Sequence, residues 1–321
     1  MSPDPIEQLR ARRLRVTPQR RAILNAFTGR AEEHLSADEV HSLASTVVPE
    51  IRRSTVYATL AELAELGLLA SVGSSEPIRY ETNTEPHDHF RCRLCLRLFD
   101  VNLNASPTAL EGFLVERVST LAEGVCKECC SYKRGLEDGA RAMLREPQLD
   151  EELLRALACI TLPSPLGTLL LATSARGVVR IAFEDHADAE LLHARARSRR
   201  GPRAAHERAQ RASETVSQYF AGWRDPWRDQ VDWIRAEEAS AGALEATRAI
   251  PYGTPRSYDR LGVEIEAYAC GFALGSNPVP ILLPCHRVSV GSERPDVWVG
   301  GSERLRLIRQ LEADALAATA G

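Results

Sequence analysis

Two closely spaced cysteine pairs constrain the fold of this chain more than any other feature of its sequence. Cys92 and Cys95 form one C-x-x-C motif, and Cys126 and Cys129 form a second one after a stretch of thirty residues. Each tight pair can supply two sulfur ligands from one turn, and four thiolates suit tetrahedral Zn²⁺. The spacing therefore predicts a structural zinc site.

Disulfide bonds and chance spacing are the alternative explanations of this pattern. The chain has eight cysteines, but its first residues, MSPDPIEQLRARRLR, lack the apolar core of a secretory signal. Its apolar runs are also too short to span a bilayer. We therefore expect a cytoplasmic protein, whose reduced thiols serve as metal ligands or nucleophiles. Cys130 is expected to be a spare thiol rather than a ligand.

A second group of potential metal ligands lies next to the first cysteine pair. His87 and His89 alternate in the sequence, so they project to the same side of a predicted strand. Acidic side chains are available at Glu81 and Asp100. Together these residues indicate a second metal site with mixed nitrogen and oxygen ligands, and a purely structural polar cluster is the alternative.

Helix-capping signals and apolar spacing predict a helix-turn-helix over residues 17–69. Thr17 and Ser36 can each cap the start of a helix, and Ser54 opens a third helical segment. Residues 68–82 then place apolar stretches on either side of a Gly-Ser-Ser-Glu-Pro turn, which is typical of a hairpin wing. Such a domain brings one helix to the DNA major groove, whereas a small helical bundle without a nucleic-acid role is the alternative.

The overall charge of the chain hides a basic cluster near its amino terminus. The formal net charge is −4, which is unpromising for a nucleic-acid partner when it is averaged over the whole chain. Local charge matters more for DNA binding. The arginines of this cluster are Arg10, Arg12, Arg13, Arg15, Arg20 and Arg21.

Five motifs, taken together and in this order, resemble the ferric-uptake-regulator family over about residues 6–133. They are RVTPQRRAIL, HLSADEVH, RRSTVYATL, PHDHFRCRLC and GVCKEC. The resemblance implies a metal-dependent repressor that binds double-stranded operator DNA. It also implies a winged helix over residues 1–83, a zinc-bearing dimerisation part over residues 84–133, and a homodimer formed through the zinc-bearing strands.

The same resemblance assigns metal ligands and DNA contacts residue by residue. The structural zinc falls on the four cysteines described above. A regulatory metal falls on His34, Glu81, His87, His89 and Asp100. Fe²⁺ or Mn²⁺ is the expected ion, with zinc and nickel as alternatives, and Asp100 at the last position is similar to the peroxide-sensing branch of the family. The implied DNA contacts are Arg15, Arg53, Ser54, Thr55 and Tyr57, and Ala58 stands where the family often has arginine.

The length of 321 residues suggests that a second domain follows. Residues 134–158 are charged and have a helical pattern interrupted by Pro147, so we expect a linker helix there. From Ile160, apolar segments alternate with Pro-Leu-Gly and Ala-Arg-Gly turns, which predicts short antiparallel strands. The expected fold class is α+β with two domains, the second one covering residues 159–321.

The segment PILLPCHRV contains a cysteine followed by a histidine between apolar flanks. A buried thiol has a raised pKa and is inert unless a base or a positive charge stabilises its thiolate. His286 can supply such a base to Cys285, but the dipeptide alone favours a structural cysteine. The surrounding sequence is therefore needed to distinguish a reactive cysteine from a structural one.

The surrounding motifs resemble O6-alkylguanine-DNA alkyltransferases over about residues 159–313. They are SPLG, IPYGTPRSY, GSNPVPILLPCHRV and GGSERLRLIRQLE. The resemblance implies that Cys285 accepts the alkyl group, that His286 relays a proton through water, and that Glu312 orients and polarises the histidine. Asn277 would hold the turn before the active-site segment. The transfer needs no cofactor, and the stable thioether means that each molecule acts once.

The resemblance also assigns residues around a flipped base. Tyr258 and Trp298 would lie beside the base, and Gly300 and Gly301 would allow the backbone close to it. Tyr268 stands where the family usually has the arginine that fills the gap left by the base. An aromatic ring can also wedge into a base stack. The interval from Tyr258 to Tyr268 is shorter than in the family, however.

Three functions are compatible with these two resemblances. The first is a dual-function protein, in which one domain binds operator DNA in response to metal and the other removes alkyl groups from DNA. The alternative is a transcriptional regulator whose alkyltransferase-like domain has lost repair and only binds DNA or a partner. The third is a repair protein that the metal domain merely recruits to DNA.

Overall fold

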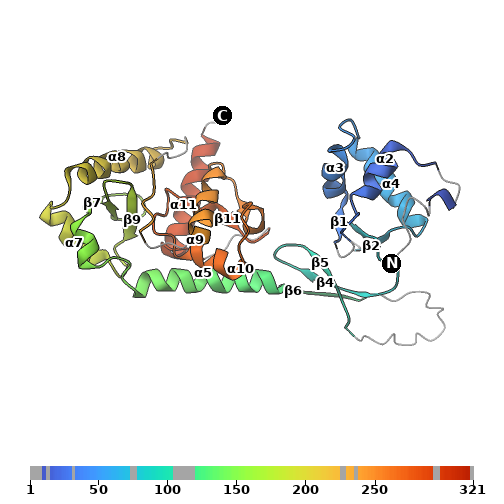
Figure 1. Cartoon of the computed structure of the whole chain (residues 1–321), viewed down its shortest axis with the longest axis horizontal. Coiled ribbons are helices and arrows are strands. Elements are labelled where there is room, and N and C mark those ends of the chain that lie inside the picture. The colour runs from blue at the N-terminus through green and yellow to red at the C-terminus, as the bar shows by residue number, and fades with distance from the viewer. Residues whose placement is uncertain are drawn as a thin grey trace. The chain divides into compact units, whose positions relative to one another are not determined.

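The computed structural model describes most of the chain, and its contacts divide the chain into two compact units (Figure 1). Unit 1 comprises Met1–Val125, and unit 2 comprises Cys126–Gly321. Among the described residues, no helix is both long and apolar enough to cross a membrane. The described residues are 9–11, 15–30, 33–72, 78–103, 120–224, 229–234, 238–291 and 297–318.

Three helices form the first part of unit 1, and two of them begin at the predicted caps. The Thr17 side chain accepts a hydrogen bond from a backbone N–H one turn into its helix. Ser36 and Glu39 form a reciprocal capping box at the start of the next helix. The helices are α2 (Pro18–Asn25), α3 (Ala37–Ser45) and α4 (Arg53–Glu65).

The third helix starts one residue earlier than the sequence suggested. We expected Ser54 to open it, but α4 starts at Arg53, and Arg52 at the N-cap position makes no side-chain capping bond. Ser54 is an exposed residue of the first turn. Leu60 and Leu63 are buried in the core that the three helices share, so packing rather than a cap fixes α4.

A three-stranded antiparallel sheet completes a winged helix. In spatial order its strands are β1 (Leu35–Ser36), β3 (Arg79–Glu81) and β2 (Ala70–Val72). The two strands of the predicted wing are therefore present, while the wing's turn at residues 73–77 lies outside the described residues. Arg12 and Arg13 of the basic cluster also lie outside them.

A second three-stranded sheet follows in unit 1. In spatial order its strands are β5 (Leu98–Val101), β4 (Asp88–Cys92) and β6 (Leu121–Gly124). The antiparallel register of β4 and β5 places His89 opposite Asp100, and the parallel register of β4 and β6 places Cys92 opposite Gly124. Both predicted metal sites thus draw on β4, one near its start and one at its end.

Unit 2 begins with helix α5 (Lys127–Arg145), and the short helix α6 (Glu151–Arg155) follows it. We expected one linker helix over residues 134–158. Instead, α5 starts directly after Cys126, and Tyr132 and Leu136 on one of its faces are buried. The helix is therefore a packed part of unit 2 rather than an exposed connection.

The predicted antiparallel strands come next and form a small sheet covered by helices. Every residue of the two strands β8 and β9 is buried, and all of them except Thr173 and Arg180 are apolar. The sheet consists of β7 (Ala158–Leu162), β8 (Leu169–Thr173) and β9 (Val178–Phe183), and it packs against α7 (Ala189–Ser198) and α8 (Arg203–Phe220).

The last part of unit 2 is mainly helical and carries Cys285. The mixed α+β class with two domains that we predicted is confirmed. The elements are α9 (Glu238–Ala246), η1 (Thr247–Ala249), β10 (Arg256–Ser257), η2 (Tyr258–Arg260), α10 (Ala267–Gly275), η3 (Cys285–Arg287), β11 (Val288–Ser289) and α11 (Gly301–Ala317).

Helices α5 and α10 approach each other so closely that their backbones touch (Figure 1). A Cβ atom at Gly135 of α5 would lie 2.1 Å from the carbonyl oxygen of Tyr268, and one at Gly271 of α10 would lie 2.1 Å from that of Tyr132. The same contact repeats one turn further along both helices. Only glycine allows this approach, because any side chain would push the helices apart.

Candidate functional site

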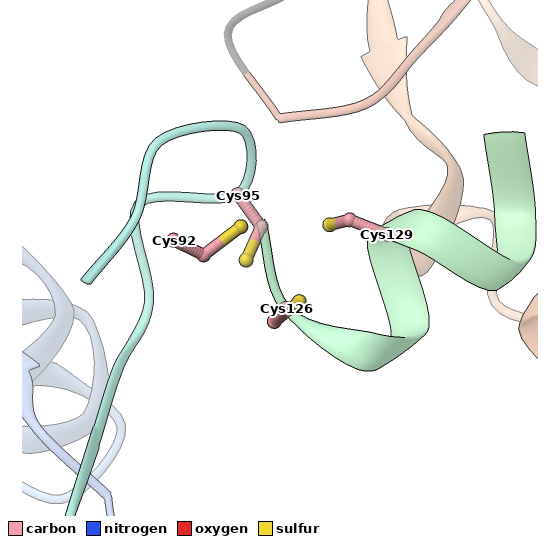
Figure 2. A group of neighbouring side chains, drawn as sticks. All are labelled: Cys92, Cys95, Cys126 and Cys129. Carbon is pink, nitrogen blue, oxygen red and sulfur yellow. The ribbon is translucent and has the colours of Figure 1, made fainter. Parts of the chain in front are cut away.

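Four cysteines gather at the end of β4 and the start of α5 (Figure 2). Cys92 ends β4, and Cys95 lies in the turn that follows. Cys126 occupies the N-cap position of α5, and Cys129 lies in its first turn. The four sulfur atoms lie within 4.8 Å of one another. Tetrahedral zinc with bonds of about 2.3 Å holds its sulfur ligands roughly 3.8 Å apart, so these residues fit the predicted ion.

The second predicted ligand set also converges, within unit 1. One ligand atom from each of the five residues lies within 4.8 Å of the others. The His34 Nε2 atom is 3.1 Å from Glu81 Oε2 and 3.0 Å from Asp100 Oδ1. His87 Nε2 is 3.3 Å from the same two carboxylates, and His89 Nε2 is 3.2 Å from Glu81 Oε1. Strands β3, β4 and β5 supply Glu81, His89 and Asp100, and His87 lies just before β4.

Several polar atoms of this cluster are buried without a hydrogen-bond partner among the described residues. They are His34 Nδ1 and Nε2, Glu81 Oε2 and His87 Nε2. Such atoms are costly unless a ligand satisfies them, and imidazole and carboxylate together suit a divalent metal. Burial lowers the pKa of His89, which favours the neutral form that binds metals. Burial also lowers the pKa of His87, but the bond to the Glu85 backbone and the nearby carboxylates raise it overall.

The residues predicted to contact DNA in unit 1 lie on α4 and just before α2. Tyr57 projects from α4 and is 51% exposed. Arg53 and Ser54 of the first turn are exposed, and Thr55 is half-buried. Arg15 is exposed as well. These side chains are therefore accessible to a large partner, as the predicted DNA contact requires.

Cys285 lies in the single-turn helix η3 and is held by two hydrogen-bond donors. Asn277 Nδ2 donates to the Cys285 sulfur at 3.1 Å and to the Leu283 carbonyl at 2.8 Å, so it also fixes the turn. The indole Nε1 of Trp298 donates to the same sulfur at 3.1 Å. Burial raises the pKa of the Cys285 thiol, and the two donors oppose this shift because they stabilise the thiolate.

A buried histidine and carboxylate form a pair next to this cysteine. His286 Nε2 lies 2.9 Å from Glu312 Oε1. The Arg287 guanidinium donates to the same oxygen at 2.7 Å, and the Tyr219 hydroxyl donates to it at 2.8 Å. Burial alone would raise the pKa of Glu312, but the bonds from His286 and Arg287 lower it to about 2. Burial lowers the pKa of His286, which favours a neutral imidazole.

Sequence reasoning found the histidine and carboxylate of this network but missed Arg287 and Tyr219. Arg287 directly follows His286 in the PCHRV segment, so its position was visible in the sequence. Tyr219 lies on α8, in a segment without a motif. Only the tertiary structure brings it to Glu312.

The space beside Cys285 is a cavity of about 10 Å³. Its lining includes His286, Trp298 and Tyr132, and the last of these comes from α5. A cavity of this size holds about one water molecule. His286 Nδ1 is buried and has no hydrogen-bond partner among the described residues, so one water would satisfy it.

The two tyrosines that the resemblance assigns to base flipping, Tyr258 beside the base and Tyr268 in the gap that it leaves, both contact residues of α5. Tyr258 stacks on Tyr132, with ring centroids 4.2 Å apart. Tyr268, the predicted wedge, donates its hydroxyl to Asp138 at 3.0 Å, and Arg134 lies over its ring. Sequence reasoning did not foresee this, because it treated α5 as a linker.

The two glycines predicted to admit a base have different surroundings. A Cβ atom at Gly300 would lie 2.4 Å from the Trp298 ring, so this glycine makes room for the indole that covers Cys285. Gly301 has a positive φ of 83° and open space around its Cβ position. Its role in the structure is to turn the backbone into α11.

Two protein families match separate parts of the chain. The Ferric uptake regulator family matches residues 11–111, and the family described as 6-O-methylguanine DNA methyltransferase, DNA binding domain, matches residues 239–313. The transcriptional regulator FurA of Mycobacterium tuberculosis is 33% identical over 135 residues, which cover 40% of this chain and 90% of FurA. A DNA base-flipping protein of Thermus thermophilus is 37% identical over 130 residues, which cover 40% of this chain and 80% of that protein. The chain belongs to both families.

After the families that they match, we call unit 1 the regulator unit and unit 2 the methyltransferase unit. A methylated-DNA–protein-cysteine methyltransferase of Mycobacterium tuberculosis is 35% identical over 105 residues; the match covers 32% of this chain and 63% of that protein. The crystal structure of the O6-methylguanine methyltransferase of the same organism is 28% identical. The match covers 50% of this chain and 94% of the crystallised chain, with a TM-score of 0.41. The fusion that the sequence motifs predicted is thus confirmed, and the four-cysteine cluster supports a structural zinc.

Proposed function

We propose that the methyltransferase unit transfers an alkyl group from O6-alkylguanine in DNA to its own Cys285. One observation carries this proposal: the Cys285 sulfur accepts two hydrogen bonds while the His286–Glu312 pair lies beside it. Two donors and a neighbouring base are what a buried thiol needs to react as a thiolate. A cysteine with only a structural role would need neither.

The proposed transfer uses the proton path that the cavity provides. His286 Nε2 is bound to Glu312, so Nδ1 is left to accept a proton. The thiol proton passes through one water to Nδ1, and Glu312 stabilises the imidazolium that forms. The sulfur then forms a bond to the alkyl carbon while the bond from that carbon to guanine O6 breaks. The electron pair stays with the guanine, which takes the proton back through the water.

The product of this step is a thioether at Cys285 and an unmodified guanine. The thioether is a stable bond, so each molecule reacts once, and the proposed step needs no cofactor. Asn277 and Trp298 act by holding the sulfur and stabilising its negative charge. They therefore belong to the proposed catalytic machinery together with His286 and Glu312.

Transfer of a radiolabelled methyl group from methylated duplex DNA tests this proposal. Wild-type protein is expected to acquire label in proportion to its amount, and Cys285→Ser is expected to acquire none. A wild-type protein without label, or equal label on Cys285→Ser, would exclude alkyl transfer to this residue. Folding of the variant is checked by thermal unfolding.

We further propose that the regulator unit binds operator DNA as a homodimer when a divalent metal occupies the second ligand cluster. The buried polar atoms of His34, Glu81 and His87 that lack partners support such a site, and Fe²⁺ or Mn²⁺ is the proposed ion. Zinc on the four cysteines would stabilise the fold without taking part in chemistry. The exposed residues of α4, with Tyr57 among them, are the proposed DNA contacts.

Binding of purified protein to promoter fragments, with and without added Mn²⁺, tests the regulatory part. Metal-dependent binding to one promoter over random DNA is expected. Equal binding to all fragments would instead support a repair protein that the regulator unit merely recruits. The alternative of a unit that has lost repair is not favoured, because Cys285, His286 and Glu312 are all assembled.

A further inference from the structure

One tyrosine from α5 fills the space beside the proposed alkyl acceptor. The Tyr132 side chain is only 1% exposed and lines the same cavity as Cys285 and Trp298. Its ring lies parallel to that of Tyr258, with 16° between the planes. By the family resemblance, Tyr258 is the residue that stands beside a flipped base. Tyr132 thus covers a face of Tyr258 on which another aromatic ring could stack.

The remaining space cannot accept a base in this structure. The cavity of about 10 Å³ has room for one water, whereas a purine is a bicyclic ring. Cys285 itself is only 6% exposed, and the indole of Trp298 covers it. A base can reach the sulfur only if Tyr132 leaves.

The helix that carries Tyr132 also covers α10, the helix that carries Tyr268. Along α10, the positions of Tyr268, Gly271 and Gly275 follow helical spacing and form one face. This face touches the backbone of α5, and Tyr268 is bound to Asp138 there. While α5 covers this face, α10 cannot insert it into a DNA groove.

The contact between α5 and α10 extends along both helices and does not depend on one residue. The buried residues of α5 recur every three or four positions and form a continuous stripe. They are Cys129, Tyr132, Gly135, Leu136, Gly139, Ala140 and Met143. Glycines on both helices permit the close approach. An interface with matched glycines on both sides indicates a specific packing state of α5.

From these observations we propose that α5 is an internal ligand of the base pocket, which blocks Cys285 until α5 moves away. Tyr132 takes the place of the flipped base, and the glycine face of α5 takes the place of DNA on α10. The proposal rests on the alkyl transfer proposed above. It adds that methyl transfer by the whole chain is limited by release of α5.

The first test compares rates of methyl transfer from a duplex oligonucleotide with a single O6-methylguanine. Tyr132→Ala opens the pocket and is expected to react about tenfold faster than wild type, because the base no longer has to displace the Tyr132 ring. Tyr132→Phe keeps the ring and is expected to react at the wild-type rate. Glu137→Ala, on an exposed position of α5, is the control and is expected to change nothing. A folded Tyr132→Ala protein that reacts no faster than wild type would overturn the proposal.

A second variant separates the helices without removing the tyrosine. Gly135→Leu places atoms where the Tyr268 carbonyl lies, 2.1 Å from the new Cβ atom, so α5 must shift away. It is expected to raise the transfer rate as Tyr132→Ala does. Gly242→Leu on α9 is the matched control, because nothing lies within 4 Å of its Cβ position. Thermal unfolding shows which variants remain folded.

Labelling of Cys285 by iodoacetamide without DNA distinguishes failure of this proposal from failure of alkyl transfer. Peptide mapping by mass spectrometry follows Cys285 alone. Faster labelling in Tyr132→Ala and Gly135→Leu, with no methyl transfer by any variant, would support the block while refuting the transfer. Equal labelling of all variants, with normal methyl transfer by wild type, would refute the block while leaving the transfer intact.

Discussion

The ring of Tyr132 stacks on the ring of Tyr258, with centroids 4.2 Å apart and planes inclined by 16°. Stacked aromatic pairs contribute about 0.5–1.5 kcal/mol beyond the area that they bury. This pair joins the helix that follows the cysteine cluster to the pocket of the proposed alkyl acceptor. On this proposal, access to Cys285 depends on the position of α5.

Trp298→Phe removes the N–H group that donates to the Cys285 sulfur and keeps an aromatic ring. With one donor fewer, the pKa of the thiol rises, and methyl transfer at neutral pH is expected to slow by about tenfold, or ~1.4 kcal/mol. The pH dependence of the transfer rate measures this change. Trp223→Phe, at an exposed indole, is the control. An unchanged rate in Trp298→Phe would show that the indole donor has no role.

Glu312→Gln keeps the shape of a buried side chain and removes its charge. The folded pKa of Glu312 is about 2, below its ordinary value of 4.5, so the carboxylate stabilises the fold above pH 4.5. That contribution, about 3 kcal/mol, is lost as pH falls from 4.5 to 2. Urea unfolding should therefore show a variant that is less stable at pH 7 and less sensitive to acid. Glu303→Gln, at an exposed position of α11, is the control, and identical pH profiles for Glu312→Gln and wild type would contradict the assignment.

His186 is predicted to make the methyltransferase unit sensitive to milder acid. Its Nδ1 accepts from Arg180 at 2.9 Å and its Nε2 donates to the Val299 carbonyl at 2.8 Å, so the ring must stay neutral. Burial and the charge of Arg180 lower the pKa of His186 from 6.5 to about 4. Between these values the unfolded chain binds a proton that the folded chain does not, so stability falls by about 3 kcal/mol as pH decreases. His186→Gln should flatten the dependence of stability on pH between 6.5 and 4, and the control His193→Gln should not. Equal slopes in wild type and both variants would rule out this role of His186.

His34→Ala should abolish the stabilisation of the regulator unit by metal. Its Nε2 atom lies between Glu81 and Asp100, at 3.1 and 3.0 Å. When the free ion is present at one hundred times its Kd, its binding stabilises the folded unit by about 2.7 kcal/mol. Thermal unfolding with and without Mn²⁺ measures this shift in wild type. His41→Ala, outside the cluster, should retain the shift, and a full shift in His34→Ala would show that the ion binds elsewhere.

Removal of zinc should loosen the start of α5 and expose Cys285. Cys126 and Cys129 lie at the first turn of α5, and Tyr132 follows one turn later. A chelator that strips the metal lets this turn fray, so labelling of Cys285 by iodoacetamide should become about threefold faster. In Tyr132→Ala, where the pocket is already open, the chelator should have no further effect. Unchanged labelling of the chelated wild-type protein would argue against any link between the cluster and the pocket.

Much of the regulator unit could be predicted from sequence because its signals are local or chemically distinctive. Thr17 and Ser36 cap their helices as expected, and these bonds form within one turn of chain. Ser54 was wrong as a helix start, because burial of Leu60 and Leu63 fixes α4 without a cap. The two metal-ligand sets could be proposed because few other patterns combine histidine, cysteine and acids so closely.

The contact between α5 and α10 could not be predicted in the same way. Tyr132 looks like an ordinary helix residue, and its partner Tyr258 lies far away in the sequence. The signal that could have revealed the contact is the four-residue glycine spacing present in both helices, at Gly135 and Gly139 and again at Gly271 and Gly275. Small residues at this spacing allow helix backbones to approach closely, as they do in membrane helices.

Mass spectrometry of the peptide that contains Cys285, after incubation with duplex DNA bearing O6-methylguanine, tests the central claim most directly. The expected result is one methyl group on Cys285 of the wild-type protein, which accumulates about tenfold faster in Tyr132→Ala. Unmodified Cys285 in both proteins, or methylation of another residue in Cys285→Ser at the wild-type rate, would contradict it.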